Sequence, residues 1–180
     1  FEENVPGATP PLSFSLITGG RSNLTYKVVD AKQQTYVLRR PPLGLVLESA
    51  HNMGREYKII SALGKTDIPV APALGLCQDR GVNEADFYVM GFVEGQVYTS
   101  SVQAAGIPTA DRKSLGLNTI ETLVQLHRID PDTIGLGDLG KKEDYVARQV
   151  RRWTKQYENT KTDDLLEMEE VGRLLKDNIP

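Results

Sequence analysis

Residues 12–40 read LSFSLITGGRSNLTYKVVDAKQQTYVLRR, and this stretch decides the fold. Runs rich in β-branched and aromatic residues occupy 12–17, 23–29 and 35–39, and a glycine turn and a polar turn separate them. Such runs, bounded by turn residues, are typical of strands joined by hairpins. Pro41 and Pro42 follow, and proline has no N–H to donate to a strand ladder. The stretch therefore predicts three consecutive antiparallel strands.

The residues after this stretch predict one helix and two more strands. Ser49 is a candidate N-cap for a helix over residues 50–63, and Gly64 is the expected left-handed stop. Apolar residues recur there at helical spacing and predict a buried stripe: Met53, Tyr57, Ile60 and Leu63. Residues 73–77 and 87–92 read as strands. The order β-β-β-α-β-β indicates an α+β fold with a five-stranded antiparallel sheet and one helix, because a parallel sheet needs βαβ alternation.

The second half of the chain is helical. Periodic apolar residues predict helices over residues 109–129, 143–157 and 163–176, and residues 93–108 form a linker. His127 lies on the apolar stripe of the first of these helices, where a buried, hydrogen-bonded histidine is favoured over a general base. We therefore expect two parts, a sheet-bearing domain over residues 1–95 and a helical domain over residues 96–180.

Composition excludes several classes of protein. The 180 residues carry a formal net charge of −3, so no global basic footprint for nucleic acid is present. Cys77 is the single cysteine, which rules out an intrachain disulfide and a cysteine zinc cluster. No apolar run has the length that a membrane span needs, which is about 18 residues or more. We expect a cytoplasmic protein that binds neither nucleic acid nor membranes; a dimer is left open.

One motif resembles a nucleotide loop but lacks its context. Residues 135–140 read GLGDLG, which matches the GxGxxG pattern, and Lys141 follows. A dinucleotide or P-loop site needs a strand before the glycines, whereas a helix end and a turn precede them here. Lys142 also stands where a P-loop places a serine or threonine for magnesium. A helix-to-helix loop is the favoured interpretation.

A second set of features follows the strand order more closely. The turn between the first two strands contains Gly19, Gly20, Ser22 and Asn23, and glycines there let backbone N–H groups approach phosphates. Arg39 ends the third strand, where a cation neutralises phosphate charge, and Glu56 on the following helix is predicted to hold it through a bidentate pair.

The same strands predict a place for a purine base. Val37 and Arg39 are two residues apart and share a face of the strand, so Val37 covers an adenine ring while Arg39 reaches the phosphates. Met90 is predicted to pack behind the base. The carbonyl of Gly91 and the N–H of Val93, on either side of Phe92, pair with its edge. The alternative is that Arg39 and Arg40 are surface charges and that Glu56 is a solvated helix residue.

Several segments together resemble a known family. They are residues 17–26 (ITGGRSNLTY), 36–42 (YVLRRPP), 49–57 (SAHNMGREY), 68–72 (IPVAP), 87–90 (FYVM), 123–127 (LVQLH) and 147–153 (ARQVRRW). The chain resembles the aminoglycoside phosphotransferase-like family of the protein-kinase-like fold. More narrowly, it is similar to the phosphotransferase domains whose relatives are fused to acyl-CoA dehydrogenases.

The resemblance implies an ATP-dependent kinase of hydroxyl groups that also uses Mg²⁺. It implies that residues 1–95 form the nucleotide-binding small lobe and that residues 96–180 form the first helices of the large lobe. Arg39 then stands in place of the family's phosphate-anchoring lysine. The family's His-Gly-Asp catalytic loop does not occur in residues 1–180, so the catalytic and magnesium-binding residues are expected beyond this chain and the chain alone is expected to be inactive. The alternative is a non-catalytic, pseudokinase-like nucleotide-binding or interaction module.

Overall fold

The computed structural model describes residues 1, 5–18, 22–43 and 51–179. Its sheet contains β1 (Ser13–Leu16), β2 (Leu24–Val29), β3 (Thr35–Arg40), β4 (Ala73–Cys77) and β5 (Phe87–Gly91). Its helices are α1 (Met53–Leu63), α2 (Arg80–Asn83), α3 (Ser101–Ala104), α4 (Thr109–Arg128), α5 (Tyr145–Thr160) and α6 (Leu166–Asp177). The strands lie within one or two residues of the predicted ranges.

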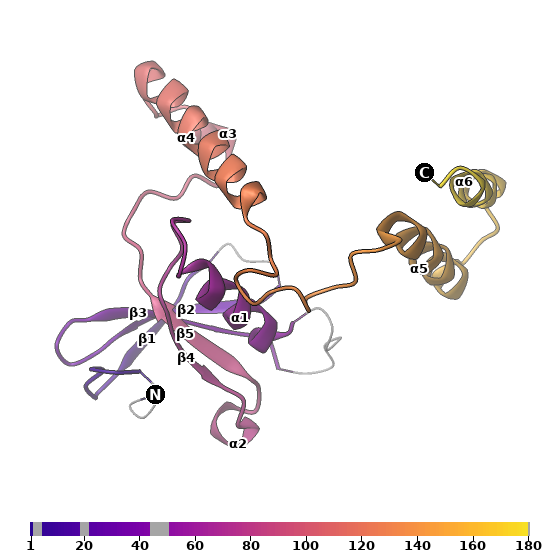
Figure 1. The fold of residues 1–180 in the computed structure, drawn as a ribbon. Helices are drawn as coiled ribbons and strands as arrows, with labels where there is room; N and C mark the ends of the chain where they lie inside the picture. The colour runs from indigo at the N-terminus through magenta and orange to yellow at the C-terminus, as the bar shows by residue number, and fades with distance from the viewer. Residues whose placement is uncertain (2–4, 19–21, 44–50, 180) are drawn as a thin grey trace. The chain divides into compact units, whose positions relative to one another are not determined.

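The sheet has five strands in the order β1-β2-β3-β5-β4, and every neighbouring pair is antiparallel (Figure 1). Consecutive hairpins place β1, β2 and β3 side by side. β5 pairs with β3, and β4 takes the outer edge. The predicted α+β class, with a five-stranded antiparallel sheet and one helix between its third and fourth strands, is confirmed.

One face of the sheet carries the hydrophobic core. Alternating residues of three strands are buried there together with Val5: Val28, Tyr36, Leu38, Phe87 and Val89. Phe1, Ala8 and Leu12 pack against this cluster, and the ring of Phe1 meets that of Tyr36 edge-on at 5.8 Å. The N-terminal segment therefore covers this face, and the opposite face is left for α1.

A buried carboxylate fixes the turn between β2 and β3. Asp30 accepts backbone N–H groups from Thr9 at 3.1 Å and from Lys32 and Gln34 at 2.8 Å each. Gln33 in the same turn adopts a left-handed φ of 63°. Burial raises the pKa of Asp30, but the three N–H donors outweigh burial and lower the pKa below its ordinary 3.8.

We expect Asp30→Asn to lower the urea midpoint of unfolding, because an amide cannot accept all three N–H groups as strongly as a carboxylate does. A depressed pKa in the folded state means that the stabilisation is present above pH 3.8 and is lost as the pH falls through the folded value. Urea titrations at neutral and acidic pH check both statements. An unchanged midpoint in the variant contradicts this role of Asp30.

Two expectations about α1 are wrong. The helix starts at Met53, three residues later than predicted, because Asn52 adopts extended backbone and accepts the N–H of Arg55 at 2.8 Å. Asn52 is therefore the N-cap; Ser49 lies outside the described residues. Gly64 ends the helix with right-handed angles (φ −63°, ψ −9°) instead of the left-handed ones expected. Its N–H still bonds to Ile60, so the helical turn closes without a left-handed residue.

Two short helices lie between the predicted elements. α2 begins after Asp79, whose side chain caps the N–H of Gly81 at 2.8 Å. α3 begins after Ser100 inside the predicted linker over residues 93–108, and Ser100 accepts the N–H of Gln103. Each is a single turn started by a side-chain cap, which apolar periodicity cannot detect.

The helical half agrees with the predicted helices, but not with their predicted burial. The chain divides into two compact units, residues 1–137 and 138–180; α4 belongs to the first, and α5 and α6 belong to the second. The domain boundary predicted after residue 95 lies after β5 and stays a prediction. His127, expected to be buried, is exposed on α4. Its helix has no buried residue.

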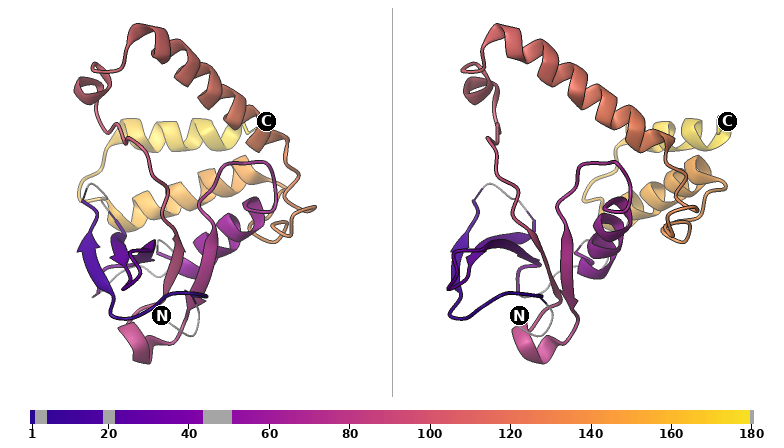
Figure 2. Two further views of the ribbon diagram at one scale, coloured as in Figure 1. Left: turned by 90° about the vertical axis from the view of Figure 1, so that its left-hand side faces the viewer. Right: turned by 60° about the vertical axis from the view of Figure 1, so that its left-hand side comes forward.

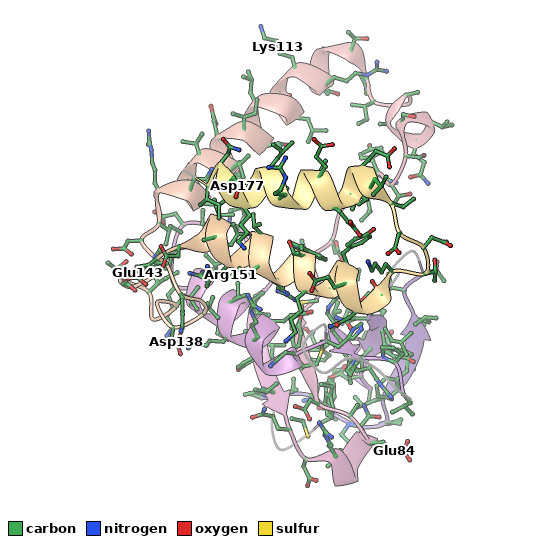
Figure 3. The ribbon with its side chains drawn as sticks, turned by 90° about the vertical axis from the view of Figure 1, so that its right-hand side faces the viewer. Glu84, Lys113, Asp138, Glu143, Arg151 and Asp177 are labelled. Atoms are coloured by element: carbon green, nitrogen blue, oxygen red, sulfur yellow. The ribbon has the colours of Figure 1, made fainter. Side chains whose placement is uncertain are left out.

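α5 and α6 form a helix pair in the second unit. The views agree that they lie side by side (Figures 2 and 3), with Arg151 labelled on α5 and Asp177 on α6. Lys161, directly after α5, bonds to Asp164 at 2.7 Å and to Glu169 at 3.3 Å and so ties the connection to α6. None of the helices in the described part of the chain has both the length and the apolar character of a membrane span.

Candidate functional site

Strand register gathers the candidate residues on the sheet face that α1 covers, here called the helix face. Arg39 on β3 lies opposite Thr25 on β2 and opposite Tyr88 on β5. Val37, two residues earlier, lies opposite Met90 on β5. Directly paired residues of antiparallel strands share a face, and so do residues two apart. The predicted placement of Val37 beside Arg39 therefore follows from the pleat.

Arg39 and Glu56 form an ion pair between β3 and α1. The Nε of Arg39 lies 2.8 Å from Oε2 of Glu56, and each side chain is 32% exposed. The pair is therefore partly shielded from water, which strengthens its attraction relative to a surface pair. α1 is held over the strands by Met53, which is 1% exposed, and by the ring of Tyr57, 6.2 Å from that of Tyr88.

The predicted bidentate geometry is wrong. The second carboxylate oxygen of Glu56, Oε1, accepts the Nδ2 amide of Asn23 at 2.9 Å instead of a second guanidinium nitrogen. Oε2 also accepts the hydroxyl of Tyr88 at 3.1 Å. The Nη1 of Arg39 donates to the hydroxyl of Thr25 at 3.1 Å. Neutral donors from Asn23, directly before β2, and from Tyr88 on β5 thus add to the ion pair, and both carboxylate oxygens of Glu56 accept hydrogen bonds.

One nitrogen of Arg39 remains available. Nε and Nη1 are committed to Glu56 and Thr25, whereas Nη2 meets no acceptor among the residues that the structure describes. Because two of its nitrogens are bonded to protein, the guanidinium of Arg39 is already ordered when an anion arrives. It can then donate a charged hydrogen bond to that anion. The arrangement suits an oxygen-rich anion such as phosphate.

Tyr88 is the most strongly perturbed group of the site. Only 3% of it is exposed, and burial, followed by the negative charge of Glu56, raises the pKa of Tyr88 to about 12. Its phenol therefore stays protonated and donates to Glu56 across the neutral pH range. Tyr88 acts as a fixed donor to Glu56, not as an acid or base.

We expect Tyr88→Phe to reduce the loss of stability between pH 10 and about 12. The pKa is raised in the folded state, so the contribution of the neutral phenol is present below the unfolded pKa of 10.0 and is lost as the pH rises to about 12. Two pKa units correspond to about 3 kcal/mol at most. Urea titrations in pH steps across this range measure it.

Tyr36 provides an internal control for that experiment. Burial also raises the pKa of Tyr36, which lies on the opposite face of the sheet and is present in both proteins. Only the difference between the wild type and the Tyr88→Phe variant therefore reports on Tyr88. Parallel pH profiles for the two proteins would show that the hydroxyl of Tyr88 does not carry this linkage.

The residues predicted to hold a base lie on β3, at the end of β5 and directly after β5. Val37 is buried and Met90 is half-buried on the helix face. Gly91 donates its N–H to the carbonyl of Pro72 at 2.8 Å, and a Cβ there would lie 3.1 Å from the ring of Pro72. Phe92 is half-buried, whereas Val93 is 66% exposed. The structure groups these residues, and their contact with a base stays a prediction.

The predicted phosphate turn is only partly described. Gly19 and Gly20 lie outside the described residues. Ser22 is exposed, and Asn23 is 8% exposed with its side chain committed to Glu56. Asn23 therefore has a supporting contact inside the site in addition to the phosphate contact predicted for its segment.

Sequence reasoning missed four residues that touch the predicted ones: Thr25, Lys27, His51 and Tyr88. Lys27 lies opposite Val37 on β2, and its Nζ stands 5.0 Å from the ring centre of Phe92. Strand register contains the signal for Thr25, Lys27 and Tyr88, because each pairs directly with a predicted residue. His51 has no such signal, since it precedes α1 in a connecting segment.

No metal-ligand set is found in the described part of the chain, where no three His, Cys, Asp or Glu side chains converge. The helix face presents a cation and apolar side chains, and its described residues form no carboxylate cluster.

Comparison with known proteins identifies the family. The model of the phosphotransferase enzyme family matches residues 13–180. The chain belongs to this family. Human acyl-CoA dehydrogenase family member 11 is 34% identical over 169 residues, which are 94% of this chain and 21% of the human protein. Mouse acyl-CoA dehydrogenase family member 10 is 33% identical over 173 residues, 96% of this chain and 16% of its own length.

A solved structure agrees with this membership. The crystal structure of a "putative aminoglycoside phosphotransferase" from Ralstonia eutropha superimposes with a TM-score of 0.77 at 35% identity and covers 99% of this chain. The chain spans 51% of that protein and about a fifth of the human relative. The expected family, the aminoglycoside phosphotransferase-like one with relatives among the acyl-CoA dehydrogenases, is confirmed.

Proposed function

We propose that this chain is the ATP-binding part of a kinase that transfers the γ-phosphate of ATP to a substrate hydroxyl. The observation that carries the proposal is the Arg39–Glu56 pair, 2.8 Å apart, on the same strand face as Val37. Membership of the phosphotransferase enzyme family supports the reaction class. The use of ATP is inferred from the cation and the apolar side chains of the helix face.

The phosphate end of the site centres on Arg39. Its Nε and Nη1 are bonded to protein, and its third nitrogen meets no acceptor among the described residues. Phosphate oxygens accept well from such a fork, and an ordered guanidinium loses little entropy when it binds them. Gly19, Gly20, Ser22 and Asn23 are proposed to add contacts from the β1–β2 turn.

The base end of the site is proposed to lie over Val37 and Met90, which pair across β3 and β5. The carbonyl of Gly91 and the N–H of Val93 are proposed to contact the adenine edge, and Phe92 to pack beside it. A base stacked on apolar side chains buries surface and gains dispersion contacts. The two proposed ends lie two residues apart along β3, which supports the binding of base and phosphate on one continuous face.

Magnesium has no proposed ligand within residues 1–180. When bound, the ion neutralises charge that develops on the β and γ phosphates. The described residues do not supply a carboxylate set for it, so its ligands and the catalytic loop are proposed to lie in the rest of the protein. The present chain alone is then expected to bind nucleotide and not to transfer phosphate.

The phosphate acceptor is proposed to be a small hydroxylated metabolite in the cytoplasm, in particular a hydroxyacyl thioester. Relatives named as acyl-CoA dehydrogenase family members support this choice over an aminoglycoside. A hydroxyl group on the acyl chain would provide the nucleophile for phosphate.

The test uses protein expressed from its complete gene. Calorimetric titration with Mg-ATP is expected to show binding, and ³¹P NMR is expected to show ADP when a hydroxyacyl-CoA is added. An aminoglycoside provides the comparison acceptor. Lack of binding at millimolar ATP refutes the proposal. Binding without transfer to any hydroxyl compound supports instead the non-catalytic module, which the arginine in place of a lysine also motivates.

A further inference from the structure

A chain of hydrogen bonds links the segment before α1 to the Arg39–Glu56 pair. His51 lies directly before the N-cap of α1, and its Nδ1 stands 2.5 Å from Oδ1 of Asn23 and 3.4 Å from the hydroxyl of Ser22. Asn23 in turn donates from Nδ2 to Glu56 at 2.9 Å. Glu56 then contacts Arg39. His51 therefore reaches the phosphate-facing cation through two intermediates.

The direction of each bond follows from the chemistry of the groups. A carboxylate paired with a guanidinium only accepts hydrogen bonds, so the amide nitrogen of Asn23 must face Glu56. The amide oxygen of Asn23 must then face His51, and an oxygen without hydrogen needs a donor. Nδ1 of His51 consequently carries a proton.

We propose that His51 is a positioning residue for the nucleotide site: its Nδ1–H fixes the amide of Asn23, and Asn23 fixes Glu56 and thereby Arg39. The proposal rests on the function proposed above. It joins Ser22 and Asn23, directly before β2, to the start of α1. A nucleotide that contacts both Asn23 and Arg39 then binds two residues that are already ordered relative to each other, which lowers the entropy lost on binding.

Matched substitutions separate this role from a general stabilising one. His51→Asn places an amide N–H where Nδ1 stands, whereas His51→Gln carries its N–H further out, near the position of Nε2. We expect His51→Gln and His51→Ala to weaken Mg-ATP binding by about fivefold, the effect of one hydrogen bond. His51→Asn is expected to bind within about twofold of wild type, while the thermal midpoints of the Asn and Gln variants agree.

The measurements use protein expressed from its complete gene: calorimetric Kd values, KM for ATP and kcat. The positioning role predicts a raised KM in the Gln variant and its recovery in the Asn variant. Equal Kd values in wild type, His51→Asn and His51→Gln overturn it, and so does an equal loss in both variants. A wild type that does not bind Mg-ATP overturns the proposed function together with this role.

A second measurement decides the hydrogen-bond chain without nucleotide. The ¹⁵N shifts of the imidazole distinguish protonated from unprotonated ring nitrogens. We expect Nδ1 of His51 to be protonated in the nucleotide-free protein. A neutral ring protonated only at Nε2 refutes the chain, whatever the nucleotide affinity of the variants.

Discussion

Replacing Arg39 with alanine is expected to weaken Mg-ATP binding by about 10- to 100-fold. Hydrogen bonds that involve a charged group contribute roughly 1.5 to 3 kcal/mol, and one such contact to phosphate accounts for a loss of this size. Arg39 is the guanidinium that Glu56 orients on the helix face. Calorimetric titration of the protein from its complete gene, at one fixed ionic strength, measures the effect.

Arg40 supplies the matched control. It is the next residue of β3, so its side chain points to the opposite face of the sheet. There it donates to the carbonyl of Pro41 at 3.1 Å and to the amide oxygen of Asn83 at 3.0 Å. Arg40→Ala removes the same charge from the same strand and is expected to leave affinity within about twofold. Equal losses in both variants would mean that only net charge matters and would contradict the site.

Replacing Glu56 with alanine is expected to lower the free energy of unfolding by about 2 to 4 kcal/mol. Three donors lose their acceptor at once: Arg39, Asn23 and Tyr88. Asn23 is 8% exposed and Tyr88 is 3% exposed, so water cannot freely replace the lost carboxylate. A buried donor left unpaired costs about 1 to 3 kcal/mol. Urea unfolding provides the measurement.

Arg55→Ala is the control on the same helix. Arg55 is exposed beside Glu56, and its backbone N–H, which Asn52 caps, is kept in the variant. We expect a change within about 0.5 kcal/mol, as for other surface substitutions. A loss in Arg55→Ala as large as that in Glu56→Ala would assign the effect to α1 in general. The double variant Arg39→Ala/Glu56→Ala should cost less than the two single variants added together, because the two residues are in contact.

The strands were predictable because their signal is local. Alternation of β-branched and aromatic residues places each strand, and turn residues end it. The same local rule placed Val37 and Arg39 on one face. The start of α1 was harder to predict, because Ser49 and Asn52 are both good caps by residue type and only the backbone angles of Asn52 select it.

Burial in the helical half was not predictable in this way. A stripe of apolar residues indicates which side of a helix can be buried, and it does not say whether a partner covers that side. His127 lies on such a stripe and is exposed.

The sequence by itself determined the α+β order of elements, the antiparallel hairpins and the shared face of Val37 and Arg39, because each depends on residues close together in the chain. Only the tertiary structure decided which residues Glu56 contacts. Its contacts to Asn23 and Tyr88 span 33 and 32 positions, and that of His51 to Asn23 spans 28. Such contacts depend on β5 pairing beside β3 and on α1 packing against β4 and β5. Side-chain hydrogen bonds require positions correct to a fraction of an ångström, which local propensity does not specify.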